Sequence, residues 1–279
     1  MNWPALAAAR ARQVPRVPFF IDGLEVGSVA RADLQALQAW PQWLSLQEDG
    51  VSLTAGDRDG ALAAINTALR QQGRVRAWRD ETYAIRDPAT GRHIARTERA
   101  ASRFWGTLTL GAHANGYVAD AQGRPTHLWI ARRSLAKATD PGLLDNLIGG
   151  GVPDGQTPQE TLVREGWEEA GLTPAQMLQA RAGRVIRLHR DIPEGLQFED
   201  LHGFDLQLPA GLVPQTQDGE VAGFELLPVA QALAHAATEE MTVDAALVTL
   251  EFGLRHGLLG VTEMQALEGA AAGLWSGRA

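Results

Sequence analysis

Residues 150–172 read GGVPDGQTPQETLVREGWEEAGL, a glycine-rich loop followed by the signals that begin and end one helix. Thr157 is a favourable N-cap residue, and Glu160 three positions later completes a capping box. Pro158 suits the first helical turn, and Gly171 is the residue type that most often follows a helix C-terminus. The sequence therefore predicts a well-defined helix directly after an open loop.

Three carboxylates fall on one face of this predicted helix, because Glu165, Glu168 and Glu169 are spaced i, i+3 and i+4. Like charges at this spacing repel each other, and a bound cation would remove the repulsion. Oxygen ligands beside a glycine loop indicate Mg²⁺ or Mn²⁺ holding a phosphorylated substrate, whereas the alternative is a solvated acidic helix. The residues expected to pack inward from the opposite arc are Leu162, Val163, Gly166, Trp167 and Ala170.

At these residues the stretch resembles the signature of the Nudix hydrolases, G-x5-E-x7-R-E-U-x-E-E-x-G-U with U apolar. The positions in register are Gly150, Arg164, Glu165, Glu168, Glu169, Gly171 and Leu172. Two positions differ, since Gln156 replaces the first glutamate and Gly166 replaces an apolar residue. We expect Gln156 to accept a hydrogen bond from Arg164 without forming an ion pair. Gly166 should weaken the helix by about 1 kcal/mol relative to Ala.

The resemblance implies an α/β fold, an α/β/α sandwich with a mixed sheet, and hydrolysis of a diphosphate linkage. The metal ligands that it implies are Glu165, Glu168, Glu169 and a carbonyl of the loop at Gly150. Arg164 would orient the carboxylates. Either Glu165 or Glu220 would take a proton from the attacking water, because Nudix enzymes commonly add a carboxylate from a loop beyond the signature.

Basic residues precede the glycine loop. Arg132 and Arg133 follow the short apolar run 128–131, and Lys137, the chain's only lysine, comes soon after. Their position is suitable for binding a polyphosphate, although a solvated loop explains an arginine pair equally well. His113 lies within a predicted strand at 108–118, where a hydrogen-bonded structural role is favoured over that of a base.

The organisation of the chain suggests two parts, residues 1–103 as a small α+β module and residues 104–279 as the hydrolase domain. In the first part we expect a hairpin with its turn at Asp22-Gly23 and a second hairpin within 78–95. The expected helices cover 30–39, 60–70, 243–255 and 262–275, and the further strands cover 184–189, 203–208 and 221–227.

Composition excludes several classes of function. The net charge of -8, without a basic stripe, argues against nucleic-acid binding. The chain has no cysteine, so thiol catalysis and zinc–cysteine sites are excluded. No apolar run has the length of a membrane span, and we expect a cytoplasmic protein. Oligomeric state is left open.

The resemblance extends to one Nudix subgroup through residues 111–117, the segment 141–146 with Lys137, and residues 218–221. That subgroup includes plant Nudix proteins and the Nudix portion of a fungal thiamine pyrophosphokinase, and it carries an uncharacterised N-terminal domain. It implies hydrolysis of thiamine diphosphate, or its oxidised analogues, to the monophosphate. The alternatives are a nucleoside diphosphate derivative or dinucleotide as substrate, and a silent binding module. The N-terminal module contributes Trp40, Trp43 and Trp78, from which an aromatic wall could bind the organic group. For each tryptophan singly, burial in the core is the favoured alternative, so the hypothesis concerns the module and not any one residue.

Overall fold

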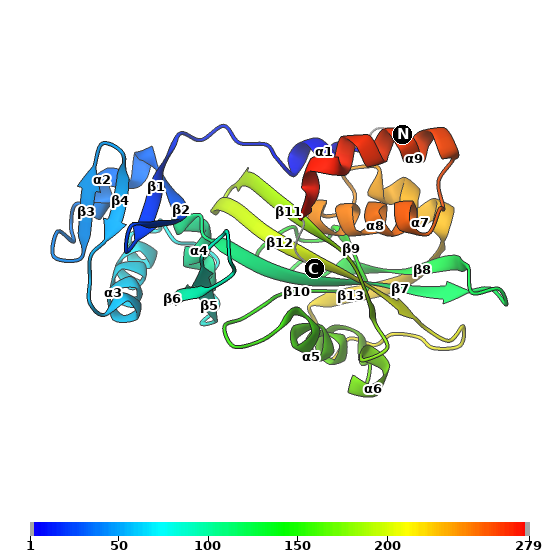
Figure 1. Cartoon of the computed structure of the whole chain (residues 1–279). Coiled ribbons are helices and arrows are strands. Elements are labelled where there is room, and N and C mark those ends of the chain that lie inside the picture. The colour runs from blue at the N-terminus through cyan, green and yellow to red at the C-terminus, as the bar shows by residue number, and fades with distance from the viewer. Residues whose placement is uncertain (1–2, 277–279) are drawn as a thin grey trace.

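The computed structural model describes residues 3–276, and its centre is an eight-stranded mixed sheet (Figure 1). The main strands, in spatial order, are β13 (Val221–Pro228), β8 (Pro125–Arg133), β7 (Leu108–Ala119), β12 (Gly195–Gln207), β11 (Arg181–Ile192) and β14 (Trp275–Ser276). In addition, β10 (Ile148–Gly151) pairs with β7, and β9 (Leu144–Asp145) pairs with β8. Strands β7 and β12 are parallel while β7 and β8 are antiparallel, which confirms the predicted mixed sheet.

Helices cover both faces of this sheet (Figure 1). On one face lie α5 (Pro158–Ala170) and the short α6 (Pro174–Met177). On the other face lie α7 (Val229–Ala236), α8 (Val243–Arg255) and α9 (Val261–Ala271). Each face has its own buried apolar cluster, so the sheet is sandwiched between two cores. The predicted α/β/α sandwich is therefore confirmed, with α7 as a helix that the sequence analysis did not predict.

A smaller module precedes the sandwich and has a separate core. Its four-stranded sheet has the order β2 (Leu24–Ala30), β1 (Arg16–Ile21), β4 (Gly50–Leu53) and β3 (Leu44–Gln47). The remaining elements are η1 (Arg31–Asp33), α2 (Leu34–Leu37), α3 (Arg58–Gln71), the hairpin β5 (Thr82–Arg86) and β6 (His93–Glu98), and α4 (Arg99–Trp105). Asp22 and Gly23 have φ values of 52° and 75°, as a tight hairpin turn requires. The predicted helix at 30–39 is only two short turns.

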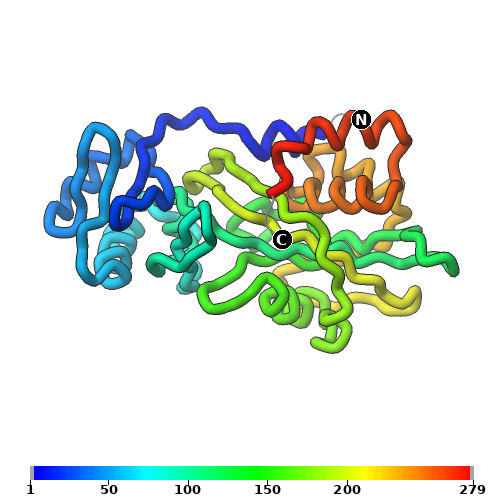
Figure 2. Tube along the Cα trace, in the orientation of Figure 1, coloured from blue at the N-terminus to red at the C-terminus, as the bar shows by residue number. Residues whose placement is uncertain are grey.

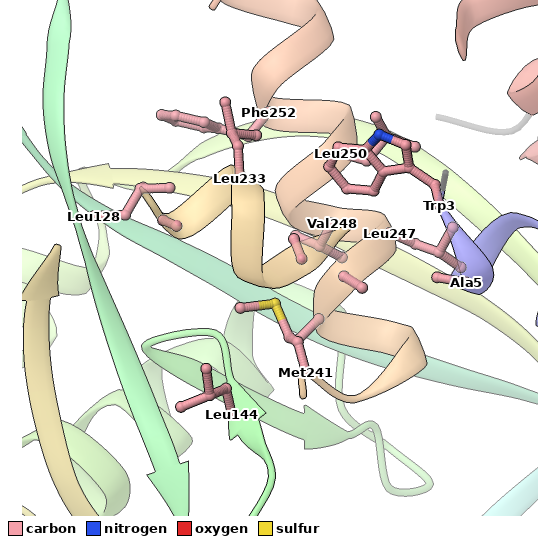
Figure 3. Close-up of a cluster of buried hydrophobic side chains, with 14 of the residues drawn as sticks. Trp3, Ala5, Leu128, Leu144, Leu233, Met241, Leu247, Val248, Leu250 and Phe252 are labelled. Carbon is pink, nitrogen blue, oxygen red and sulfur yellow. The ribbon is translucent and has the colours of Figure 1, made fainter. Parts of the chain in front are cut away.

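Residues 3–9 pack on the sandwich and not on the small module (Figure 2). Helix α1 (Pro4–Ala8) lies against α8, and Trp3 and Ala5 are buried with Leu247 in the core on that side (Figure 3). The chain then follows β11, where His189 N donates to Ala9 O at 2.9 Å. The N-terminus therefore connects the two parts of the molecule.

Helix α5 matches the predicted bounds but not every predicted inward contact. Leu162, Gly166 and Ala170 are buried, whereas Trp167 is 51% exposed, so the expectation that Trp167 packs inward is wrong. Gly166 lies against α6, where an added Cβ would come within 2.5 Å of Met177 Sδ. The close approach of α6 explains why glycine stands here instead of an apolar side chain. Among the helices of residues 3–276, none combines the length and apolarity needed to cross a membrane.

Candidate active site

A cavity of about 420 Å³ lies where the small module meets the sandwich, and both parts line it. The small module contributes Arg76, Ala77, Arg79, Tyr83, Arg99, Ala100 and Arg103. The sandwich contributes the glycine strand β10, Glu165 of α5, and residues from α8, β11 and β12, together with Lys137 and Glu220 from loops. The signature helix therefore faces a space that neither part encloses alone.

Helix α5 is fixed by the caps that its sequence predicts. Thr157 Oγ1 accepts from Glu160 N at 3.2 Å, and Glu160 Oε2 accepts from Thr157 N at 2.8 Å. At the other end, Gly171 adopts the left-handed conformation with φ of 66°. The three glutamates of the signature are thereby presented from a rigid helix that packs on β10 and β7.

Glu165 lies against the glycine strand. An added Cβ on Gly150 would be 2.2 Å from Glu165 Oε1, so only glycine permits this approach. Arg164 Nη2 donates to Glu165 Oε1 at 2.8 Å. Burial raises the pKa of Glu165, and the charge of Glu168 raises it further, while Arg164 opposes both effects. Glu165 is therefore a desolvated carboxylate at the cavity wall.

Arg164 joins two of the predicted ligands. Its Nη1 donates to Glu168 Oε2 at 2.7 Å, while its Nη2 contacts Glu165. The side chains of Glu165 and Glu168 are 12% and 39% exposed, so the shared arginine connects a buried carboxylate with one open to solvent. This is the orienting position that the sequence analysis predicts for Arg164.

Glu169 is the most enclosed of the three glutamates, with a side chain 7% exposed. Its Oε2 accepts from Gly149 N at 2.8 Å, and its Oε1 lies 3.5 Å from Lys137 Nζ. Burial raises the pKa of Glu169 to about 8, even though Lys137 lowers it, and the charge of Glu165 raises it. The chain's single lysine thus offsets only part of the effect of burial on the deepest carboxyl group of the helix.

The donor chemistry at α5 fits a divalent metal. Within residues 3–276, no three His, Asp or Glu side chains already gather into a ligand set, because these oxygens point to Arg164, Lys137 and Gly149 N. However, all three carboxylates are hard oxygen donors; the charge of Glu168 raises the pKa of Glu165, and the charge of Glu165 raises the pKa of Glu169. A divalent cation among Glu165, Glu168 and Glu169 would remove that repulsion.

Glu220, the candidate base from outside the helix, lines the same cavity and forms an ion pair with Lys137. Burial opposes its ionisation, but the hydrogen bond and charge of Lys137, with smaller contributions from Arg79 and Arg99, lower its pKa. The two glutamates therefore have opposite pKa shifts: the pKa of Glu220 is lowered, and the pKa of Glu165 is raised.

The three predicted phosphate-binding residues lie in different places. Lys137 and Arg133 line the cavity, but Arg133 is already bound to Asp145 at 2.7 Å and to the carbonyl of Thr139 at 2.8 Å. Arg132 is not in the cavity wall, and its Nη1 donates to Gly142 O at 3.1 Å. The structure brings together two of the three.

His113 and Gln156 have local structural partners. Nδ1 of the buried His113 lies 3.0 Å from Asn146 Oδ1, as expected for a structural histidine, although the ring also borders the cavity. Gln156 Oε1 accepts from Thr161 Oγ1 at 3.0 Å. The expected hydrogen bond from Arg164 to Gln156 is not made, because both ends of the guanidinium are used by Glu165 and Glu168.

The aromatic wall expected from the first half of the chain does not form. Trp40, Trp43 and Trp78 pack against the core of the small module and do not line the cavity. The module presents arginines there instead. The sequence signal for them is the run RQQGRVRAWR at 70–79, which has four arginines in ten residues.

A second polar group that the sequence did not point to also lines the cavity. Gln197 Nε2 donates to Glu199 Oε2 and to Asp244 Oδ2, both at 3.0 Å. Arg103 Nη2 donates to Glu199 at 2.9 Å. Burial raises the pKa of Asp244, and the charge of Glu199 raises it further. The wall therefore combines a paired carboxylate with a second carboxyl that lacks an ion-pair partner within residues 3–276.

Family models match both parts of the chain. A NUDIX domain model matches residues 109–246, and a model described as a domain of unknown function (DUF4743) matches residues 5–109. The crystal structure of DR0079 from Deinococcus radiodurans aligns with a TM-score of 0.47 at 25% identity, covering 60% of this chain and 97% of that one.

Two relatives from Arabidopsis thaliana match across both parts. Nudix hydrolase 24, chloroplastic, is 34% identical over 252 residues, which cover 87% of this chain and 68% of the relative. Nudix hydrolase 20, chloroplastic, is 38% identical over 205 residues, which cover 73% of this chain and 54% of the relative. With its signature helix, mixed sandwich and N-terminal domain, the chain belongs to the Nudix hydrolase family.

Proposed function

We propose that this Nudix hydrolase uses Mg²⁺ or Mn²⁺ to cleave thiamine diphosphate, or its oxidised analogues, to the monophosphate. The observation that carries the proposal is the cavity itself, because Glu165 of α5 lines it together with the carboxyl groups of Glu199 and Asp244. The α5 carboxylate suits a metal-held diphosphate, and the carboxyl groups of Glu199 and Asp244 suit a positively charged organic group.

The residues of α5 would prepare the diphosphate for attack. Glu165, Glu168 and Glu169 would hold a divalent ion, which would supply positive charge against the diphosphate oxygens and lower the pKa of the attacking water. Arg164 holds Glu165 and Glu168 in one orientation through its two hydrogen bonds. Because Gly150 has no side chain, the backbone of β10 lies beside Glu165. A carbonyl of this strand can therefore complete the set of oxygen ligands for the metal.

We infer that Glu165 accepts the proton of the attacking water. Glu165 lines the cavity, and an oxygen of its carboxylate that does not hold the metal would accept the proton. Glu220 is the weaker candidate, because its pKa is lowered and its carboxylate is bound to Lys137. We propose instead that Glu220, through its ion pair with Lys137, holds Lys137 beside Glu169.

The organic group is proposed to lie against Gln197, Glu199 and Asp244. Thiamine carries a cationic ring and an exocyclic amine, which suit carboxyl oxygens in a partly desolvated wall. Asp244 has no ion-pair partner within residues 3–276, so a cationic ligand would stabilise its charged form. A neutral organic group would leave this carboxyl unpaired, and that difference is a basis for selectivity.

The test is a comparison of diphosphates with the full-length protein and Mg²⁺. We expect a higher kcat/KM for thiamine diphosphate or its oxidised analogues than for ADP-ribose or nucleoside triphosphates. Asp244→Asn should reduce this preference while leaving the hydrolysis of ADP-ribose and nucleoside triphosphates unchanged. A clear preference for a nucleoside diphosphate derivative or a dinucleotide in the unchanged protein would overturn the thiamine proposal. The cytoplasmic location stays a prediction, and the two plant relatives are named chloroplastic.

A further inference from the structure

Seven cationic side chains line the cavity, and most already have partners. Arg99 is bound to Glu81 at 2.7 Å, Arg103 to Glu199 at 2.9 Å, and Arg133 to Asp145 at 2.7 Å. Lys137 is bound to Glu169 and Glu220. Arg190 Nε donates to the neutral amide of Gln197 at 2.9 Å. These side chains are committed to holding the walls of the cavity.

The other two cations are Arg76 and Arg79, both on the loop between α3 and β5. In the described part of the chain, neither has a carboxylate within 4.0 Å. Arg76 Nε donates a long hydrogen bond of 3.3 Å to Gly73 O in its own loop. Both arginines are exposed. Exposed guanidinium groups without acidic partners, facing a cavity, are available to an anion.

The loop that carries Arg76 and Arg79 has a defined shape. Ala77 and Asp80 have φ values of 56° and 57°, which are costly for residues other than glycine. Trp78 Nε1 donates to Asp80 Oδ1 at 2.7 Å, and Glu98 accepts from Arg79 N at 2.9 Å. These hydrogen bonds and the positive φ values of Ala77 and Asp80 give the loop a defined shape, and both arginines line the cavity.

The charges of this module reach the metal-binding helix. Arg99 acts on the carboxylate of Glu165, and Arg79 and Arg99 both act on Glu220. The hairpin β5–β6 also contacts the glycine loop directly, because Thr82 O accepts from Asp154 N at 2.8 Å and Arg96 Nε donates to Asp154 Oδ2 at 2.6 Å. The arginine loop is thus fixed in place relative to the glycine loop.

From this arrangement we propose that the N-terminal module is the phosphate-binding half of the active site, with Arg76 and Arg79 binding the phosphate oxygens of the substrate. The inference rests on the proposed function, since it concerns the same cavity. It assigns to the domain of unknown function a direct part in substrate binding. Guanidinium groups suit this role because they form paired, charge-assisted hydrogen bonds with phosphate oxygens.

The experiment compares the full-length protein with Arg76→Gln, Arg79→Gln and the double variant. Arg92→Gln is the matched control, because Arg92 is an exposed arginine of the same module outside the cavity wall. Calorimetry measures the affinity for inorganic diphosphate in the presence of Mn²⁺, and for Mn²⁺ alone. Steady-state kinetics measure KM and kcat for whichever organic diphosphate is cleaved.

We expect each single variant to weaken diphosphate binding and raise KM by about tenfold, and the double variant by more, as loss of charge-assisted hydrogen bonds predicts. Affinity for Mn²⁺ alone and the melting temperature should stay as in Arg92→Gln. Unchanged diphosphate affinity and KM in the double variant would overturn the inference, as would an equal loss of Mn²⁺ affinity. If no organic diphosphate is cleaved, the proposed function fails, while the calorimetry still decides the role of the arginines.

Discussion

At the residue scale, three glutamates on one helical face have three different environments. Glu169 is buried against Gly149 N and Lys137, Glu165 is largely buried against Gly150, and Glu168 is partly open to solvent. Helical spacing predicts that the carboxylates are neighbours, but it does not predict their burial. Burial depends on how closely β10 approaches α5, which the glycines of that strand allow.

The first prediction concerns these ligands. Glu168→Gln and Glu169→Gln should each lower metal-dependent turnover on the order of a hundredfold or more, because an amide is a poorer ligand for Mg²⁺ than a carboxylate. Glu160→Gln is the control, since glutamine also completes a capping box and Glu160 is part of that box at the helix start. Full activity in either ligand variant, measured as initial rate at saturating Mg²⁺, would refute the metal assignment.

Gln156 is the residue that weakens the match to the family signature, and its contact explains how glutamine serves there. Its Oε1 accepts from Thr161 Oγ1, which fixes the loop to the first turn of α5. Arg164 needs no partner at this position, because Glu165 and Glu168 satisfy it. The sequence identified the substitution, but the alternative partner depends on the path of the folded loop.

The second prediction follows from that contact. Gln156→Glu should change kcat/KM by less than about threefold, since a carboxylate accepts the same hydrogen bond from Thr161 and the difference is under about 1 kcal/mol. The measurement is kcat/KM for the preferred diphosphate at saturating Mg²⁺. A gain of about a hundredfold would mean that glutamine disables this site, and would favour the silent binding module.

At the scale of elements, local sequence signals predicted the caps and turns correctly, but they did not predict the contacts between distant elements. The caps of α5 and the Asp22-Gly23 turn depend on neighbouring residues, and both are present in the structure. Strands β11 and β12 form one long hairpin, whereas the sequence analysis expected two shorter strands. The cavity wall requires Arg103 to meet Glu199, 96 residues away, and no local pattern encodes that pairing.

The third prediction concerns how the hairpin of β11 and β12 packs on α4. Gly195 at its turn has φ of 139°, and an added Cβ would lie 2.3 Å from Arg103 O. Gly195→Ala should therefore lower the free energy of unfolding by about 2 kcal/mol or more. It should also raise KM, because Arg103 and Pro193 line the cavity.

The control for Gly195→Ala is Gly211→Ala, since no atom lies within 4 Å of an added Cβ at Gly211. This change should alter the free energy of unfolding by less than about 0.5 kcal/mol. Urea denaturation gives both values. Equal stability of the two variants would contradict the tight packing between the hairpin turn and α4.

At the scale of the whole molecule, the two parts of the chain make one site. The small module has its own core, but its arginines and Tyr83 complete a cavity whose other walls come from the sandwich. Helix α1 packs on α8, on the face of the sandwich that does not carry α5 (Figure 3). The sequence predicted two closely packed parts and assigned substrate reading to the N-terminal module. The tryptophans proposed to form its aromatic wall pack against the core, as was favoured for each of them singly.

The central claim is that the carboxylate face of α5 supports metal-dependent hydrolysis of a diphosphate in this shared cavity. The most direct measurement is turnover of thiamine diphosphate and other organic diphosphates by full-length protein stripped with a chelator, before and after Mg²⁺ or Mn²⁺ is added. We predict no turnover in the stripped protein and release of a monophosphate once the metal is restored. Equal turnover with and without metal, or cleavage of no diphosphate in its presence, would contradict the account.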